Sequence, residues 1–286
     1  MRVVHSATEL PPPAAGRSRA VVMTMGALHD GHLALVRAAR AAADEVVVTV
    51  FVNPLQFNDR ADLERYPRTL DADVALLEPE GVDFVFAPAA DDVYPGGRPV
   101  VTVSAGAIND VFEGAHRPGH FDGVLTVVLK LINLTRPDVA FFGQKDAQQV
   151  IAIRTMCRDL NVPIEIAVVP TVREPDGLAL SSRNVFLTPN ERADALALSR
   201  ALAAADVAAG SGASAPVAVA AGLAEIAAAP GVALDYLAAL DPESAQPVAD
   251  DYRGPVVIAV AAKVGATRLI DNVVTQIAGD GTGGGA

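Results

Sequence analysis

Continuous runs of apolar, β-branched residues alternate with helical patterns over the first 170 residues, and this alternation constrains the fold most strongly. The runs stand at residues 46–52, 82–88, 138–143 and 163–170. Because they lack regular polar positions, they are typical of strands buried on both faces. Helical patterns lie between several of them, at residues 31–43, 71–79, 123–135 and 145–160. Strands that alternate with helices predict βαβ units and a parallel sheet, so we expect an α/β domain over residues 1–171.

The pattern changes after this first domain. Thr188 is followed three residues later by Glu191, a capping-box spacing that predicts the start of a helix. A second helical pattern and three strand-like runs follow, at residues 216–229, 232–240, 256–264 and 267–274. We therefore expect a smaller α+β domain over residues 172–276, and we expect the glycine-rich residues 277–286 to form a flexible tail.

Composition excludes several classes of protein. A net charge of -12 argues against general nucleic-acid binding, because a phosphate backbone requires a basic face. The single cysteine, Cys157, excludes a disulfide framework and indicates a reducing compartment. Neither a secretory signal nor an apolar run of about 18 residues is visible, so we expect no membrane span and a cytoplasmic enzyme.

Two of the chain's five histidines, His29 and His32, stand at the entrance of the first predicted helix, after an apolar strand. In a parallel sheet, ligands bind at the carboxyl ends of strands, where helix N-termini also point. Gly26 and Gly31 let the backbone approach a ligand, and two imidazoles can donate hydrogen bonds to phosphate oxygens and to a transition state. A helix cap with a packing residue is the alternative. A zinc pair is disfavoured because further ligands are missing nearby.

Polar residues also follow the strand predicted at 138–143. Lys145, Asp146 and Gln149 follow within six residues of Gly143, and their spacing lets them share one face near a helix start. A lysine there is a point charge for phosphates, and an aspartate can hold a ribose hydroxyl or a metal. The alternative is a solvated helix start with an acidic residue.

Two further stretches carry weaker signals. Ser181, Ser182 and Arg183 stand in a loop between the predicted domains, and hydroxyls with an arginine suit a polyphosphate, although such a triplet also occurs by chance. Asn53 and Gln56 follow the second strand, where uncharged polar groups can bind hydroxyl or carboxylate oxygens. Turn chemistry around the intervening proline is the other explanation.

The segment at residues 89–122 interrupts the alternation of strands and helices, and we expect it to carry function or an interface. It contains His116, Arg117 and His120. An anion-binding lid and a solvated surface loop both fit these residue types.

Together these stretches resemble one family closely, the pantoate–β-alanine ligases or pantothenate synthetases, of the HIGH-type nucleotidyltransferase superfamily. The resemblance covers residues 18–276, and "HDGH" is this chain's version of the superfamily signature. The motifs that carry it are "TMGALHDGH", "FVNPLQF", "YPRT", "EGAHRPGHF", "GVLTVVLKL", "FFGQKDAQQ" and "PTVREPDGLALSSRN".

The resemblance implies a Rossmann-like N-terminal domain, a smaller C-terminal domain and a homodimer. It also implies a condensation of (R)-pantoate with β-alanine that depends on ATP and Mg²⁺, passes through a pantoyl-adenylate and releases AMP and pyrophosphate. The partners are then these small-molecule substrates, with no nucleic acid and no membrane. The reaction needs no covalent enzyme intermediate, which agrees with the lack of a candidate nucleophile triad.

The same resemblance assigns roles to individual residues. The catalytic residues it implies are His29, His32, Lys145 and Arg183. The ATP-binding residues it implies are Met25, Gly26, His32, Gly143, Lys145, Asp146, Thr171, Val172, Ser181, Ser182 and Arg183. The pantoate-binding residues it implies are Met25, Gln56 and Gln149. ATP phosphates would carry most of the Mg²⁺ coordination, with Asp73 as a candidate protein ligand.

Three positions depart from the family pattern. Met23 stands where the family has a proline beside the pantoate pocket, Leu180 replaces a methionine before the Ser-Ser-Arg triplet, and Ala147 replaces a tyrosine. None of these changes removes a charged catalytic group. The alternatives are another adenylyltransferase of the superfamily, which would not keep both "FVNPLQF" and "KDAQQ", and a non-catalytic paralogue, which would have lost one of the four catalytic residues.

Overall fold

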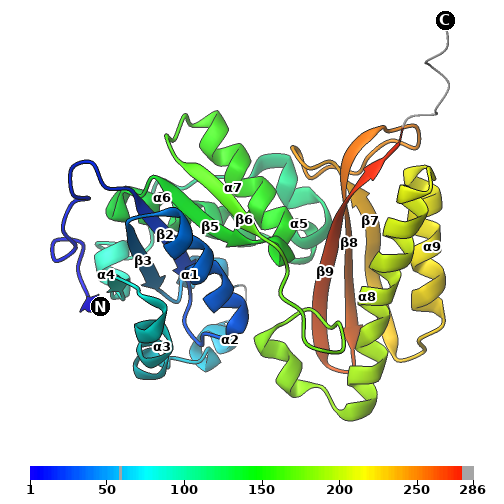
Figure 1. Ribbon diagram of the computed structural model, residues 1–286, viewed down its shortest axis with the longest axis horizontal. Coiled ribbons are helices and arrows are strands. Elements are labelled where there is room, and N and C mark those ends of the chain that lie inside the picture. Colours follow the sequence, from blue (N-terminus) through cyan, green and yellow to red (C-terminus); the bar gives the residue numbers. More distant parts are fainter. Residues whose placement is uncertain (58–59, 279–286) are drawn as a thin grey trace, which may run out of the picture. The chain divides into compact units, whose positions relative to one another are not determined.

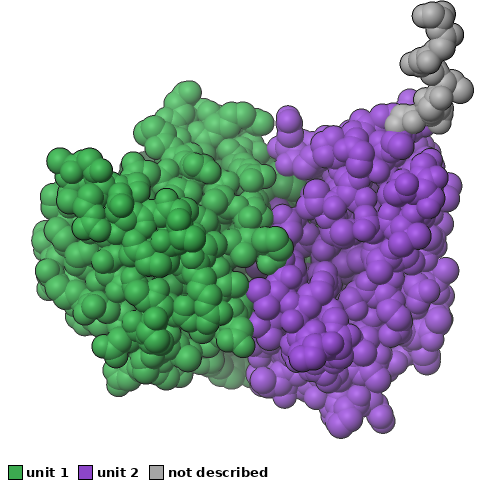
Figure 2. Space-filling model, in the orientation of Figure 1, with its two compact units in different colours: residues 1–143, 148–170 green, residues 144–147, 171–286 purple. Residues whose placement is uncertain are grey.

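The structure is a computed structural model that describes residues 1–57 and 60–278 (Figure 1). The described chain divides into two compact units (Figure 2). Unit 1 contains Met1–Gly143 and Gln148–Pro170, and unit 2 contains Gln144–Ala147 and the described residues from Thr171 onward. Residues 279–286, which make up most of the predicted flexible tail, lie outside the described residues.

Unit 1 is built on a parallel sheet of six strands in the order β1-β4-β3-β2-β5-β6. These strands are β1 (Arg2–Val4), β2 (Arg19–Thr24), β3 (Glu45–Val50), β4 (Phe84–Phe86), β5 (Val139–Gly143) and β6 (Glu165–Val169). The short β1 is too brief to leave a pattern in the sequence. The central strands are buried on both faces, as their continuous apolar runs predict: Val46, Val47 and Val48 are all fully buried.

Seven helices accompany this sheet in the described residues: α1 (Asp30–Ala42), α2 (Arg60–Arg65), α3 (Leu70–Leu77), α4 (Ala90–Val93), α5 (Phe112–His116), α6 (His120–Thr135) and α7 (Ala147–Asp159). Short 3₁₀ turns join several of them: η1 (Pro54–Gln56), η2 (Glu78–Glu80), η3 (Gly106–Asp110) and η4 (Gln144–Asp146). Val36 of α1 and Leu77 of α3 are buried in one apolar cluster with Val22 and Val48 of the sheet. Burial of these residues fixes α1 and α3 on one face of the sheet.

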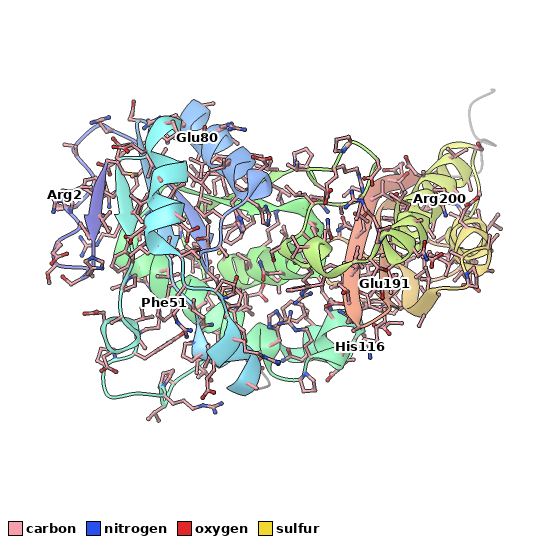
Figure 3. All side chains as sticks on the ribbon, turned by 90° about the horizontal axis from the view of Figure 1, so that it is seen from below. Arg2, Phe51, Glu80, His116, Glu191 and Arg200 are labelled. Atoms are coloured by element: carbon pink, nitrogen blue, oxygen red, sulfur yellow. The ribbon has the colours of Figure 1, made fainter. Side chains whose placement is uncertain are left out.

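Unit 2 is an α+β unit. Its antiparallel sheet has the order β7 (Val232–Leu240), β8 (Gly254–Val264) and β9 (Thr267–Ile277). The helices α8 (Pro189–Gly210) and α9 (Ala215–Ala227) pack beside this sheet, and Figure 3 labels Glu191 and Arg200 on α8. A Cβ at Gly222 of α9 would lie 2.8 Å from the carbonyl oxygen of Ala201 in α8, so the close approach of these helices requires glycine there.

The predicted fold class is confirmed: a Rossmann-like parallel sheet is followed by a smaller α+β unit. The predicted capping box is also confirmed, because Thr188 caps α8 and its hydroxyl accepts from the Glu191 N–H at 3.3 Å. The helix expected from residue 145 begins instead at Ala147, and the three residues before it form η4. Ile277 is the last residue of β9 and is fully buried, so the strand extends one residue past the predicted domain end.

The order of the strands gives the sheet of unit 1 a switch point at β2. Strand β2 lies between β3 and β5, so the chain builds the sheet first on one side of β2 and later on its other side. Ligands bind at such a switch point in open parallel sheets. The loops with the predicted site residues follow the carboxyl ends of β2, β3, β5 and β6. None of the helices within residues 1–57 and 60–278 combines the length and apolar character that crossing a membrane requires.

Candidate active site

A buried aspartate holds the loop that follows β2. Gly26 and Ala27 both have left-handed backbones, with φ of 82° and 53°. The carboxylate of Asp73, 1% exposed, accepts from the Ala27 N–H at 3.1 Å and from the Leu28 N–H at 2.8 Å. It also accepts from the Thr69 hydroxyl at 3.3 Å. An alanine in this conformation is strained, and the carboxylate fixes the loop in it. Both oxygens of this candidate Mg²⁺ ligand are therefore engaged by the protein.

The two histidines cap their own helix. His29 is the N-cap of α1, and its Nδ1 accepts from the Gly31 N–H at 3.1 Å. The Nδ1 of His32 accepts in turn from the His29 N–H at 3.3 Å, and the ring centroids are 4.1 Å apart. Because Nδ1 accepts in both rings, a neutral ring carries its proton on Nε2. The capping interpretation is thus correct for the start of α1.

A chain of hydrogen bonds orients Gln56 after β3. The Asn53 amide nitrogen donates to the carbonyl oxygen of Gly123 at 3.1 Å and to Gln56 Oε1 at 3.0 Å. A carbonyl oxygen only accepts, so the Asn53 amide cannot be flipped, and its Oδ1 faces the Tyr94 hydroxyl at 2.8 Å. Burial raises the pKa of Tyr94, which keeps this hydroxyl protonated as a donor. The Gln56 amide nitrogen is thereby directed toward Met25 Sδ, 3.0 Å away.

The loop that carries Gln56 rests on α6, and it begins directly after Phe51, which Figure 3 labels. A Cβ at Gly123 would lie 2.4 Å from the carbonyl oxygen of Leu55, so only glycine permits this packing. His120 is 6% exposed, and its Nδ1 lies 3.0 Å from the Gln56 carbonyl oxygen. His120 is therefore not part of a solvated surface loop, because it is buried and contacts the backbone of Gln56.

The segment at residues 89–122 is also fixed to α7. The buried Gln148 accepts from the Glu113 N–H at 2.9 Å, and it donates to the carbonyl oxygens of Ile108 and Val111 at 3.1 and 3.0 Å. Gln149, the predicted pantoate ligand, follows in the first turn of α7 and is half-buried. Gly143 ends β5 and is also half-buried.

Three predicted site residues of unit 2 line one pocket. Lys145 comes from η4, and Ser181 and Arg183 come from the loop before α8. Arg268 and Asp271 of β9 also line it. The apolar lining comes from Leu178, Ala179, Leu198, Leu269 and Ile270. The structure thus brings together a lysine, an arginine and a hydroxyl, which is a set of groups suited to phosphate.

The loop that presents Arg183 is braced at two points. Ser181 accepts from the Arg183 N–H at 3.2 Å and so caps the turn η5 (Ser182–Phe186). Arg192 of α8 pairs with Glu174 at 2.6 Å and with Asp176 at 2.7 Å. Hydrogen bonding to Arg192 lowers the pKa of Glu174, which therefore stays ionised and paired at neutral pH.

The remaining predicted ATP ligands of unit 2 lie outside the pocket lining. Asp146 is exposed at the end of η4, and Ser182 is exposed in η5. Val172 is half-buried, and its carbonyl oxygen accepts from the Leu180 N–H at 2.9 Å. The buried hydroxyl oxygen of Thr171 has no hydrogen-bond partner within the described chain. A buried hydroxyl without a partner is a group that a ligand can satisfy.

Two asparagines have supporting roles that their local sequence does not show. Asn53 gave a signal, since it follows a predicted strand, but its role in orienting Gln56 depends on distant residues. Asn272 of β9 gave no local signal, and its amide binds the η4 turn that carries Lys145. In the part of the chain that the structure describes, no group of three or more histidine, cysteine or acidic side chains is arranged to hold a metal ion.

Comparisons with known proteins point to one family. A family model described as pantoate-beta-alanine ligase matches residues 2–274. The pantothenate synthetase of Streptomyces avermitilis is 52% identical over 95% of this chain and 96% of its own. The pantothenate synthetase of Thermobifida fusca is 57% identical over 89% of this chain and 88% of its own.

Solved structures agree with these sequence matches. The pantothenate synthetase of Thermus thermophilus aligns with a TM-score of 0.88 and 48% identity, over 96% of this chain and 99% of that one. The pantoate-beta-alanine ligase of Francisella tularensis, complexed with beta-gamma ATP and beta-alanine, aligns with a TM-score of 0.77 and 33% identity. That alignment covers 96% of this chain and 97% of the Francisella chain.

Proposed function

The chain belongs to the pantoate–β-alanine ligase family, and from this membership we propose that it joins (R)-pantoate to β-alanine through a pantoyl-adenylate. A pantoate carboxylate oxygen attacks the α-phosphorus of ATP, and the bond to the β-phosphate breaks to release pyrophosphate. The amine of β-alanine then attacks the acyl carbon, loses a proton and displaces AMP. The observation that carries this proposal is the pocket lined by Lys145, Ser181 and Arg183.

Charge is the main obstacle to the first step. The carboxylate and the triphosphate are both anions, and negative charge builds on the departing pyrophosphate. Lys145 and Arg183 would offset this repulsion as a point charge and a forked donor, and Ser181 with Ser182 would add hydroxyl donors. Positioning and electrostatics are the main contributions that a protein makes to phosphoryl chemistry of this kind.

The histidine pair would add further donors. With Nδ1 committed to the helix cap, Nε2 is the ring nitrogen through which His29 and His32 would donate to a phosphate. Donors fixed before the reaction stabilise transition-state charge without reorganisation, which is the physical basis of oxyanion-type catalysis. We propose that both histidines act on the same ATP molecule as Lys145 and Arg183, and that Met25 and Gly26 line the path of the phosphates.

Pantoate would be bound by amides. The Gln56 amide nitrogen is directed toward Met25 by Asn53, so it can donate to a carboxylate or hydroxyl oxygen of the substrate. Gln149 would contribute the second amide. Met23, which replaces the family's proline, is half-buried in β2 opposite Thr49, so the chain accommodates the longer side chain within the strand.

The nucleoside part of ATP would use the loops after β5 and β6. Gly143 and Asp146 would hold the ribose, and Thr171 with Val172 would line the adenine pocket. The unpartnered Thr171 hydroxyl supports this assignment, since a ligand would satisfy it.

Mg²⁺ would enter with ATP. Asp73 does not fit the role of a metal ligand, because its two oxygens hold the loop after β2. Mg²⁺ commonly keeps several waters and binds substrate phosphates rather than a cage of protein ligands. We therefore propose the Mg²⁺ complex of ATP as the substrate and assign no residue of this chain to the ion.

The second step needs no nucleophile from the protein. Cys157 is buried and burial raises its thiol pKa, so it is a poor candidate for a covalent intermediate. β-Alanine would react directly as a free amine. We also propose that the two structural units act as the two functional domains, and that the enzyme works as a homodimer in the cytoplasm. Sedimentation of only a 29 kDa species at micromolar concentration would contradict the dimer.

The decisive assay measures pyrophosphate and AMP release from ATP, Mg²⁺ and pantoate, with and without β-alanine. We expect steady turnover that requires both pantoate and β-alanine and that forms one pantothenate for each AMP released. Lys145→Ala should reduce adenylation by at least about 100-fold, the usual effect of losing a transition-state charge partner. Lys263→Ala is the matched control, because Lys263 is an exposed lysine of β8. Normal turnover in Lys145→Ala would contradict the assigned role, and turnover without pantoate would contradict the proposed reaction.

A further inference from the structure

The turn η4 is held by a side chain that is far away in the sequence. The Asn272 amide nitrogen donates to the carbonyl oxygens of Gln144 and Lys145 at 2.9 and 3.0 Å. The Asn272 amide oxygen accepts from the Gln144 amide at 2.9 Å. Asn272 is 4% exposed. The buried Asn272 amide therefore forms three hydrogen bonds to Gln144 and Lys145.

The orientation of this amide is fixed by chemistry. Carbonyl oxygens only accept, so the amide nitrogen must face them, and the amide oxygen must face Gln144. The residue before it is fixed as well, because Asp271 is 3% exposed and forms two hydrogen bonds to Arg173, at 2.7 and 3.1 Å. The Asn272 N–H donates to Asp271 Oδ1 at 2.8 Å. Both neighbouring side chains of β9 are thus locked before any ligand binds.

The hydrogen bonds from Asn272 also affect the position of Lys145. The segment Gln144–Ala147 is grouped with unit 2, although the residues on either side of it belong to unit 1. Lys145 lines the same pocket as Ser181 and Arg183, which belong to unit 2 as well. The Asn272 amide of β9 binds the Lys145 backbone. It therefore fixes the backbone position from which the lysine side chain extends into the pocket that Arg183 also lines.

We infer that Asn272 is a positioning residue for adenylation: through the backbone of η4 it holds Lys145 beside Arg183 as a preformed cationic pair for the phosphates. The inference rests on the proposed function. Asn272 does not touch the reacting atoms in this scheme. A misplacement of a catalytic group by about 1 Å can lower a rate on the order of 100-fold. Loss of the Asn272 amide should therefore lower mainly the rate constant of adenylation.

Asn272→Asp is the sharpest variant. The two side chains have the same shape, but a carboxylate places oxygen against two carbonyl oxygens and repels the turn. We expect the rate constant of ATP- and pantoate-dependent pyrophosphate release to fall about 100-fold. The KM for pantoate should change less than about 3-fold, because Gln56 and Asn53 belong to unit 1 and keep their own hydrogen bonds.

Two further variants separate positioning from general destabilisation. Gln144→Ala removes one of the three hydrogen bonds and leaves Asn272 in place, so we expect a smaller loss in rate, about 10-fold. Val256→Ala removes fully buried methyl groups from the core of the same unit and serves as the stability control. If Val256→Ala lowers the melting temperature as much as Asn272→Asp and lowers the rate equally, the positioning role is wrong.

The final test is coupling to Lys145. Affinity for ATP is measured by calorimetry in the wild type, in Asn272→Asp, in Lys145→Ala and in the double variant. Because Asn272 acts through Lys145, its substitution should weaken binding severalfold in the wild type and less than about 2-fold in the Lys145→Ala background. An equal effect in both backgrounds would overturn the inference. A wild type that binds ATP but releases no pyrophosphate with pantoate would overturn the proposed function instead, and the binding cycle would still decide the role of Asn272.

Discussion

Replacing Asp73 by asparagine tests whether this carboxylate holds a loop or a metal ion. Asp73 accepts two backbone N–H bonds and one hydroxyl bond, and it does so while 1% exposed. An asparagine keeps one acceptor oxygen and places an NH₂ group against the other backbone N–H. The variant therefore loses one charge-assisted hydrogen bond, and it leaves a buried N–H unsatisfied. Together these changes should lower the free energy of unfolding by about 2–4 kcal/mol.

The effect on catalysis follows from the backbone. Ala27 is held at φ 53° by this carboxylate, and His29 follows two residues later as the cap of α1. Relaxation of the loop should displace the imidazoles and lower turnover on the order of 100-fold. Asp71→Asn is the matched control, because Asp71 lies in the same first turn of α3 but is exposed. That control should change stability by less than about 0.5 kcal/mol.

Urea unfolding and pyrophosphate release at increasing Mg²⁺ concentration separate the two roles. A loop-holding Asp73 predicts a lower unfolding free energy and a turnover defect that excess Mg²⁺ does not correct. A metal-binding Asp73 predicts the opposite: normal stability and recovery of turnover at high Mg²⁺. The second result would refute the argument made from the hydrogen bonds.

Three further predictions concern the supports of the site. Gly123→Ala should lower the unfolding free energy by at least about 2 kcal/mol and raise the KM for pantoate, since its Cβ would lie 2.4 Å from the Leu55 carbonyl oxygen; an unchanged KM would contradict this. Thr188→Ala should lower stability in urea by about 1 kcal/mol through loss of the α8 cap. Because folding lowers the pKa of Glu174, its ionised carboxylate stabilises the fold at pH values above its ordinary pKa of 4.5. This stabilisation is lost as the pH falls through the lower pKa of the folded state. In Arg192→Gln, the free energy of unfolding should therefore fall less steeply as the pH is lowered. An unchanged pH dependence would refute the role of the Arg192–Glu174 pair.

The sequence by itself predicted the alternation of strands and helices, because hydrophobic periodicity is a local property. Continuous apolar runs marked the buried parallel strands, and the capping box at Thr188 marked the start of α8. The residues proposed for the site were also visible locally: the histidine pair, Lys145 and the serine–arginine loop all follow predicted strands or stand between the predicted domains. Residue types and spacing were sufficient for these predictions, since each depends on neighbours within a few positions.

The supports of the site were visible only in three dimensions. Asp73 binds a backbone N–H that is 45 residues away, and Asn272 binds a carbonyl oxygen 128 residues away. A buried polar group must find a partner, but local sequence does not say which one, because packing of distant elements decides it. The sequence therefore determined which groups are candidates for the chemistry. The tertiary structure decided what holds them: a carboxylate for the histidine loop, an asparagine for Gln56 and a second asparagine for Lys145.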